Sequence, residues 1–171
     1  MQILRGMSIA LDEIIFTYNN ILPFVSNQQY FMEIDGPVVV IEDDQDDRIF
    51  LRDAIIDLGF KNHLKFFHDC GAVLLYLKTT IDKPFLIISD INLPGMTGTE
   101  LKKVINADEY LKKKAIPFIF YTTSDQKYAI DQAYDMMVQG FFVKENSIDK
   151  MRTTLKVIMD YWKLCKHPNS K

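Results

Sequence analysis

Five short apolar runs separated by amphipathic segments constrain the fold of this chain more than any other feature. The runs are rich in Val, Ile and Phe and are apolar at successive positions, as is typical of strands buried on both faces. They cover Val38–Ile41, Leu64–Phe67, Phe85–Ser89, Phe118–Thr122 and Phe141–Val143. Because helical segments alternate with the runs, the pattern predicts an α/β fold, a doubly wound five-stranded parallel sheet with helices on both faces.

The amphipathic segments predict five helices. Apolar residues recur at helical spacing around residues 49–58, 73–77, 101–105, 130–137 and 148–162. The first apolar stripe includes Ile49 and Phe50, and the fourth includes Tyr134 and Met137. Ser147 is placed to cap the fifth helix.

Length and composition predict one globular domain with an appendage. The chain has 171 residues, of which 48% are hydrophobic and 25% are charged. We expect the main domain to span residues 36–165 and a C-terminal tail to span 166–171. Because one helix and the tail account for the residues after the last strand, no separate output domain is expected.

Residues 1–35 form an N-terminal extension in which apolar residues recur at helical spacing between Ser8 and Pro23. One helix is therefore expected there, and it would serve dimerisation or docking, or simply pack as an appendage. Met7 and Met32 are alternative initiators, so the extension is also consistent with sequence upstream of the natural start.

Charge, hydropathy and cysteine content exclude several classes of function. The net charge is −3, and residues 1–35 carry one base and four acids, so the remaining chain is balanced and is a poor candidate for binding nucleic acid. No apolar run approaches the roughly 18 residues of a membrane span. Cys70 and Cys165 form no CxxC motif, which argues against a thiolate zinc site and fits a reducing compartment. We expect a cytoplasmic protein that binds neither membranes nor nucleic acid directly.

Charged and hydroxyl side chains gather at the ends of four apolar runs. Glu42 and Asp43 follow the first run, Asp90 follows the third, Thr122 ends the fourth, and Lys144 follows the fifth. A strand order of 2-1-3-4-5 would place these four ends side by side at the carboxyl edge of the sheet, where ligands bind in such folds.

Three carboxylates in one crevice raise each other's pKa unless a cation neutralises them. Mg²⁺ bound by a few carboxylates and water is the usual solution, and a facing lysine adds a second compensating charge. Carboxylate, Mg²⁺, lysine and hydroxyl together supply a nucleophile, a metal clamp, a cation and a hydrogen-bond donor. The set therefore indicates a site for phosphoryl transfer.

The same residues lie within four motifs that resemble the response-regulator receiver domain of two-component signalling. The resemblance extends from about Gly36 to Lys163. The motif with the sequence Asp-x-x-Leu-Pro-Gly-Met-x-Gly is the most specific. The four motifs cover Val40–Asp44, Ile87–Gly98, Phe120–Ser124 and Gly140–Lys144. The resemblance implies a stand-alone, flavodoxin-like receiver that catalyses only its own phosphorylation and dephosphorylation.

Carried over to this sequence, the resemblance implies that Asp90 accepts a phosphoryl group from a phosphohistidine on a partner. Asp43, Asp90 and the backbone carbonyl of Asn92 would bind Mg²⁺ directly. Glu42 would act mainly through metal-bound water.

The resemblance also implies roles for the residues around the phosphoryl group. Lys144 would pair with its oxygens, and the hydroxyl of Thr122 would turn toward it. Phe141 is the aromatic residue that would move inward together with Thr122. Asn92 and Ser124 occupy positions that tune the loss of the phosphoryl group.

The implied partners are a sensor histidine kinase or a phosphotransfer protein, and a downstream protein or the next member of a phosphorelay. The downstream partner would bind the face formed by the predicted helix at 130–137, the strand at 141–143 and the helix at 148–162. A homodimer is also compatible with the sequence.

One position departs from the family pattern, because Glu145 follows Lys144 where the family has a proline after a cis bond. A non-proline cis bond costs roughly 3 kcal/mol, so the Lys144–Glu145 peptide is either strained or trans. Because of this departure, the alternative function is that of a pseudo-receiver, a binding module that keeps the fold but is not phosphorylated. A haloacid-dehalogenase-like phosphatase fits less well, because that pattern needs an aspartate where Asn92 stands.

Overall fold

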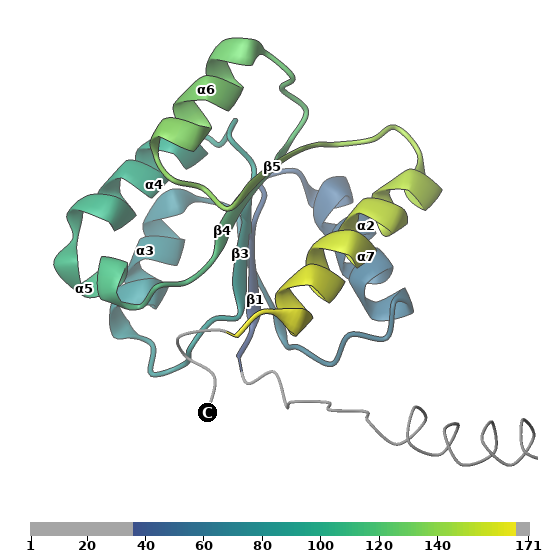
Figure 1. The fold of residues 1–171 in the computed structure, drawn as a ribbon, viewed down its shortest axis with the longest axis horizontal. Helices are drawn as coiled ribbons and strands as arrows, with labels where there is room; N and C mark the ends of the chain where they lie inside the picture. Colours follow the sequence, from purple (N-terminus) through teal and green to yellow (C-terminus); the bar gives the residue numbers. More distant parts are fainter. Residues whose placement is uncertain (1–35, 167–171) are drawn as a thin grey trace, which may run out of the picture. The chain divides into compact units, whose positions relative to one another are not determined.

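The computed structural model describes residues 36–166, and the expectations for residues 1–35 and 167–171 lie outside this range. Five parallel strands form one sheet in the order β2-β1-β3-β4-β5, as predicted (Figure 1). The apolar runs therefore become adjacent parallel strands, and each observed strand end lies within one residue of the prediction. The strands are β1 (Val38–Ile41), β2 (Leu64–Phe67), β3 (Leu86–Ser89), β4 (Phe118–Thr122) and β5 (Gly140–Val143).

Six helices cover the sheet in the described part of the chain, one more than predicted. The additional helix is short and begins where the Asp108 side chain accepts hydrogen bonds from the backbone amides of Tyr110 and Leu111. It is anchored by Leu111, which is buried. The helices are α2 (Gln45–Asp57), α3 (Cys70–Thr79), α4 (Gly98–Ala107), α5 (Glu109–Lys113), α6 (Lys127–Asp135) and α7 (Ile148–Leu164). Over residues 36–166, no helix has the length and apolar character needed to cross a membrane.

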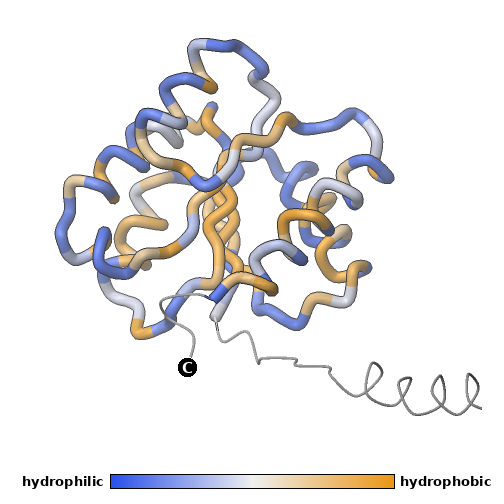
Figure 2. The backbone as a smooth tube through the Cα atoms, in the orientation of Figure 1, coloured by the Kyte–Doolittle hydropathy of each residue, from blue (hydrophilic) through white to orange (hydrophobic). Residues whose placement is uncertain are grey.

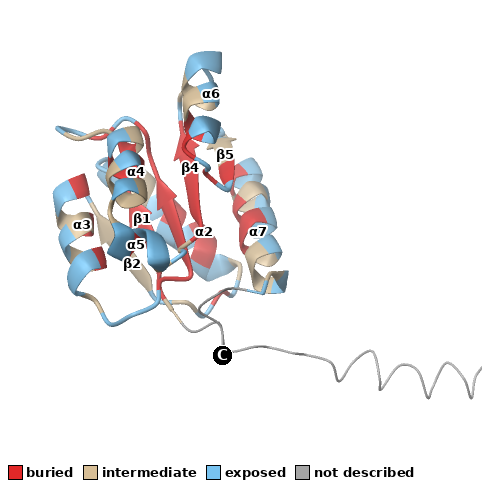
Figure 3. Ribbon diagram, turned by 60° about the vertical axis from the view of Figure 1, so that its left-hand side comes forward, coloured by how far each residue is buried: buried red, intermediate tan, exposed pale blue. Residues whose placement is uncertain are grey.

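The sheet separates two hydrophobic cores. Helices α2 and α7 cover one face, and α3, α4, α5 and α6 cover the other (Figure 1). Successive residues of a strand point alternately into the two cores. In β1, Val38 and Val40 belong to the core under α2 and α7, whereas Val39 and Ile41 belong to the core on the opposite face. The central strands are consequently buried and largely apolar, while the helices carry most of the hydrophilic and exposed positions (Figures 2 and 3). Burial on both faces explains why the strands appear as unbroken apolar runs.

Two predicted helix faces are wrong in part, because some of their residues are buried as predicted and others are exposed. In α2 the buried residues are Leu51, Ala54 and Ile55, whereas Ile49 and Phe50 are at least one-third exposed. The residues that contact the sheet therefore follow the spacing i, i+3, i+4 from Leu51.

The end of α6 also differs from the prediction. The helix stops at Asp135, and Met137 adopts a positive φ of 56° that turns its side chain to solvent. Met136 and Val138 are buried in its place, and Tyr134 is exposed. At the start of α7, Ser147 is the N-cap residue, but its side chain makes no capping hydrogen bond.

The loop between β3 and α4 approaches the sheet too closely for a side chain at Gly98. A Cβ atom there would lie 2.1 Å from the carbonyl oxygen of Asp90. The backbone amide of Gly98 donates to the carbonyl oxygen of Ile91 at 2.9 Å, and Thr97 and Glu100 form a capping box at the start of α4. The helix start is thereby held directly against the end of β3.

Candidate functional site

Two acidic residues follow β1 at the carboxyl edge of the sheet. Glu42 is 2% exposed, whereas Asp43 is exposed to solvent. The loop that carries them is held from both sides: Asp44 caps α2, and the Nη1 atom of Arg48 donates to the carbonyl oxygens of Glu42 at 2.8 Å and Asp43 at 2.9 Å. These contacts fix the backbone of both acidic residues.

Asp90 follows β3, the strand next to β1, and is 7% exposed. Its backbone amide donates to the carbonyl oxygen of Ile41 at 2.9 Å, which extends the pairing of the two strands into the site. Its Oδ1 atom accepts hydrogen bonds from the backbone amides of Ile91 at 2.5 Å and Asn92 at 3.2 Å. The carboxylate is therefore oriented by the backbone, and its second oxygen remains for other partners.

Lys144 follows β5 and joins the acidic groups from three elements. Its Nζ atom lies 2.6 Å from Oε2 of Glu42, 2.7 Å from Oδ2 of Asp47 and 3.1 Å from Oδ2 of Asp90. The side chain is 8% exposed. The backbone amide of Lys144 donates to the carbonyl oxygen of Thr122 at 2.7 Å, so β4 fixes where the lysine leaves the sheet.

The electrostatics of this cluster follow from burial and from the enclosed lysine. Burial raises the pKa of Glu42 above its ordinary value, even though the hydrogen bond from Lys144 acts in the opposite direction. Burial by itself lowers the pKa of Lys144, but its hydrogen bonds to Asp47 and Glu42 and the charge of Asp90 more than offset this, so its pKa is raised. Lys144 is thus a permanent cation at neutral pH.

Thr122 lies at the end of β4, next to the strand that precedes Asp90, and Phe141 lies on β5, the outermost strand on that side of the sheet. Thr122 is fully buried, and its Oγ1 atom accepts a hydrogen bond from the backbone amide of Ser124 at 3.3 Å. Phe141 is half-buried and packs edge-to-face on Phe120, with 6.2 Å between the ring centroids. Asn92 is exposed beside Asp90, and Ser124 is half-buried after β4. The four expected strand ends therefore lie at one edge of the sheet.

The loop after Lys144 resolves the question of its peptide bond. Between residues 36 and 166 there is no cis peptide, so the Lys144–Glu145 bond is trans. The ammonium of Lys144 nevertheless contacts Glu42 and Asp90.

Asp47 and Arg48 belong to the site but were not singled out from the sequence. Both lie in the first turn of α2, where Asp47 pairs with Lys144 and Arg48 binds the backbone of the acidic loop. In the sequence, Asp47 is one of several acidic residues that follow β1, and side-chain reach decides which of them contacts Lys144. A charged residue one turn after an acidic strand end is the signal that points to it.

The acidic residues have the geometry to bind a hard cation. One carboxylate oxygen from each of Glu42, Asp43 and Asp90 lies within 4.8 Å of the others. All three ligands are oxygens, one is exposed and two are buried, so the cluster fits a divalent cation that keeps part of its water shell. An enclosed lysine and a buried hydroxyl beside such a cation complete a set of groups for binding a phosphoryl group.

Comparison with known proteins agrees with this arrangement. Residues 38–156 match the response regulator receiver domain. The probable methanogenesis regulatory protein FilR2 of Methanothrix harundinacea (strain 6Ac) is 27% identical over 137 residues, which are 77% of this chain and 87% of that protein. The phosphorylated cyanobacterial phytochrome response regulator RcpA has a TM-score of 0.72 at 23% identity, covering 79% of this chain and 99% of RcpA. The Mn(2+)-bound form of the response regulator Rcp1 has a TM-score of 0.69 at 22% identity, covering 78% of this chain and 99% of Rcp1. This chain belongs to the response regulator receiver domain family of two-component signalling.

Proposed function

We propose that this receiver accepts a phosphoryl group on Asp90 from a histidine of a sensor kinase or phosphotransfer protein, and signals by phosphorylation-dependent binding or phosphorelay. The observation that carries the proposal is the contact of Lys144 with both Glu42 and Asp90 at the carboxyl edge of the sheet. A buried lysine there provides the charge that a phosphoryl group needs, next to a carboxylate oriented by two backbone amides.

Four groups would hold Mg²⁺ in this site: the carboxylates of Asp43 and Asp90, the backbone carbonyl of Asn92, and Glu42 through water. When bound, the cation neutralises charge on the phosphoryl oxygens as the transfer proceeds. Arg48 holds the carbonyl oxygens of Glu42 and Asp43, so the backbone that carries the two acidic side chains is fixed by the protein itself.

In the transfer step, a carboxylate oxygen of Asp90 attacks phosphorus, and the P–N bond of the phosphohistidine breaks. The imidazole nitrogen leaves with the electron pair of that bond, and Asp90 becomes an acyl phosphate. Lys144 then exchanges its contacts with Asp90 and Asp47 for the new phosphoryl oxygens. The receiver thus contributes the nucleophile and one cation, while the partner contributes the phosphoryl donor.

The phosphoryl group would change the equilibrium between two arrangements of Thr122 and Phe141. The hydroxyl of Thr122 would turn toward the phosphoryl oxygens, and Phe141 would move into the space that this opens. In this structure Phe141 is half-buried and packs edge-to-face on Phe120. Asn92 and Ser124, at the borders of the site, would tune the lifetime of the acyl phosphate.

The surface that reports this change would be the face formed by α6, β5 and α7. Tyr128 and Tyr134 on α6 are 70% and 56% exposed, and Val143 on β5 is 40% exposed. Exposed aromatic side chains of this size are typical of protein interfaces. A downstream protein, or a second copy of the chain, would bind there in the cytoplasm.

The test is intact-mass spectrometry after incubation with acetyl phosphate, with and without Mg²⁺. We expect one phosphoryl adduct on the wild type with Mg²⁺, and none on Asp90→Asn. The variant replaces one carboxylate oxygen of Asp90 by an amide NH₂ group. Circular dichroism of both proteins checks that the variant keeps the fold of the wild type. A folded wild type with neither an adduct nor measurable Mg²⁺ affinity would instead support a binding module that is not phosphorylated.

A further inference from the structure

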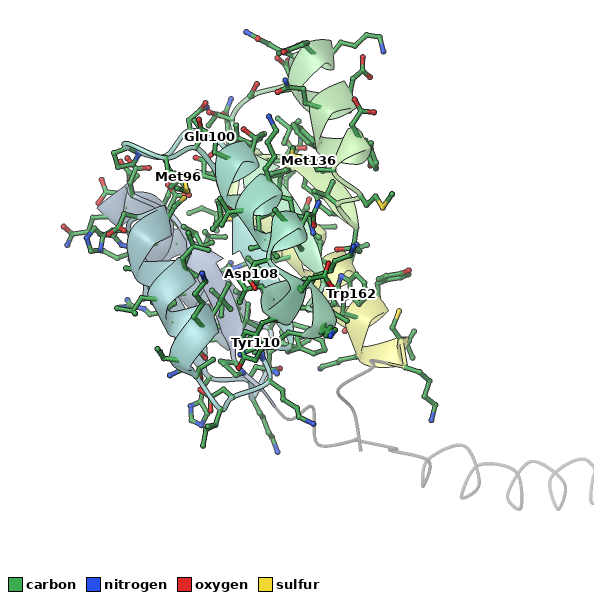
Figure 4. The ribbon with its side chains drawn as sticks, turned by 90° about the vertical axis from the view of Figure 1, so that its left-hand side faces the viewer. Met96, Glu100, Asp108, Tyr110, Met136 and Trp162 are labelled. Carbon is green, nitrogen blue, oxygen red and sulfur yellow. The ribbon has the colours of Figure 1, made fainter. Side chains whose placement is uncertain are left out.

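A cavity of about 310 Å³ is lined by residues of α4 and α5, by the start of β4 and by the C-terminal end of α7. Phe118, the first residue of β4, lines it, whereas Asp90 follows the other end of the neighbouring strand. Apolar side chains such as Ile105 and Leu111 form its walls, and Trp162 of α7 borders it. Figure 4 views α4 and α5 from this side, with Trp162 beside them. The volume is at the lower end of the range of small-molecule sites.

Lys102 of α4 lines this cavity and is only 6% exposed. Its Nζ atom lies 5.1 Å from the centroid of the Phe118 ring. Within residues 36–166, the ammonium forms neither an ion pair nor a hydrogen bond, and the face of the Phe118 ring is the one group with which it interacts. Burying a cation without an anionic partner is costly, and cation–π contact offsets only part of that cost.

The other charges around the cavity have the same sign. Lys112 of α5 and Lys166 after α7 also line it, and its lining contains no aspartate or glutamate. Asn106 and Gln139 contribute amide groups, and the remaining side chains are apolar. The lining is therefore complementary to a molecule with an anionic head and an apolar body.

We propose that this cavity is a binding site for a small amphiphilic carboxylate whose head pairs with Lys102 and whose body contacts the apolar walls. The carboxylate supplies the counter-charge that the described part of the chain lacks. Burial lowers the pKa of Lys102, and a bound anion reverses this effect, so binding also favours the protonated lysine. The site is separate from the phosphorylation site and requires neither Mg²⁺ nor a phosphoryl donor.

Octanoate is the probe for this site, with octanol and octylamine as matched ligands that share its alkyl chain. Trp162 is the only tryptophan of the chain and borders the cavity, so its fluorescence reports binding, with isothermal titration calorimetry as a second readout. We expect saturable binding of octanoate at least about tenfold tighter than that of octanol, and weaker binding of octylamine.

Three variants separate the proposed site from general hydrophobic binding. Lys102→Met should remove the preference for octanoate over octanol. Lys103→Met changes an exposed lysine on the same helix and should retain the preference. Ile105→Trp fills the cavity and should weaken both ligands. The proposal is overturned if wild type binds octanoate no tighter than octanol, if Lys102→Met keeps the preference, or if folded wild type binds none of the ligands. Because the titrations contain EDTA and no acetyl phosphate, their outcome is independent of phosphorylation.

Discussion

Lys144, at the end of β5, donates a hydrogen bond of 2.7 Å to Asp47, in the first turn of α2. This contact competes with the role proposed for Lys144 in binding the phosphoryl group. As long as the ammonium is shared among Asp47, Glu42 and Asp90, it is only partly available to an incoming phosphate. We therefore expect Asp47 to hold the lysine in place until a phosphoryl group binds.

Replacement of Asp47 by asparagine should accelerate phosphorylation. The carboxylate of Asp47 is one-third exposed, so its interaction with Lys144 contributes about 1 kcal/mol, and its loss predicts a roughly fivefold faster reaction with acetyl phosphate. The rate is measured by intact-mass spectrometry at fixed Mg²⁺. Asp46→Asn, which changes the exposed neighbouring acid, is the control. A slower reaction of Asp47→Asn would show that Asp47 assists catalysis directly.

Replacement of Lys144 by methionine should destabilise the protein in the absence of Mg²⁺. Glu42 and Asp90 would then be buried without their cation, at a cost of about 3 kcal/mol in the free energy of unfolding. Adding Mg²⁺ should restore part of this loss, because the cation neutralises the same carboxylates.

Urea unfolding with and without Mg²⁺ measures both effects of the Lys144 substitution. Lys150→Met, which removes an exposed lysine 3.7 Å from Glu145, should change stability by less than about 0.5 kcal/mol. Equal stability of Lys144→Met and wild type at pH 7 without Mg²⁺ would contradict the account.

Gly98→Ala should destabilise the fold next to Asp90, the proposed phosphoryl acceptor. The new Cβ would lie 2.1 Å from the carbonyl oxygen of Asp90, so the backbone of one of the two residues must move. We expect a loss of about 2 kcal/mol in urea unfolding and a slower reaction with acetyl phosphate. Gly71→Ala is the matched control, because its Cβ would meet only one side-chain atom, Oδ1 of Asp69, at 3.2 Å. Unchanged stability of Gly98→Ala would exclude the close approach of α4 to β3.

Lys102 should make the stability of the protein depend on pH in the alkaline range. Burial lowers the pKa of Lys102 in the folded protein below its ordinary value of 10.5, which applies in the unfolded chain. At a pH between these two values, the lysine is protonated in the unfolded chain but mostly neutral in the folded protein. The free energy of unfolding of the wild type therefore rises with pH in this window, relative to a variant without the lysine. At a pH below the pKa of Lys102 in the folded protein, the lysine is charged in both the folded and the unfolded state. The full cost of burying the charge then lowers the stability of the folded protein.

Comparison of wild type with Lys102→Met measures this effect. We expect the variant to be the more stable protein at pH 7 and its advantage to shrink as the pH approaches 10.5. Urea unfolding at a series of pH values gives the difference, with Lys103→Met as the exposed control. An advantage that does not change with pH would assign the effect to packing instead of charge.

The strands and the fold could be predicted because burial on both faces of the parallel sheet makes the central strands almost entirely apolar. The helix faces could not be predicted as well, because α2 and α6 also carry apolar residues outward. Phe50 is 44% exposed and Met137 is 78% exposed, so hydropathy alone does not identify the buried side. The short helix α5 depends on one capping carboxylate and one buried leucine, a signal too small for periodicity to detect.

The strand-end residues of the site could be predicted because the strand order places them together. Asp47, Arg48 and Lys102 could not, because their roles depend on side-chain contacts. Lys102 looks like a surface residue next to Lys103, and only the packing of α4 on β4 shows that it is buried.

The identity of the phosphorylated residue is the most direct test of the account. The protein is incubated with acetyl phosphate and Mg²⁺, the acyl phosphate is reduced with borohydride, and the modified position is read by peptide mass mapping. We expect modification at Asp90 in a Mg²⁺-dependent manner. Modification of Asp43 or Asp47 in place of Asp90, or the same yield in Asp90→Asn, would contradict the assignment of Asp90 as the phosphoryl acceptor.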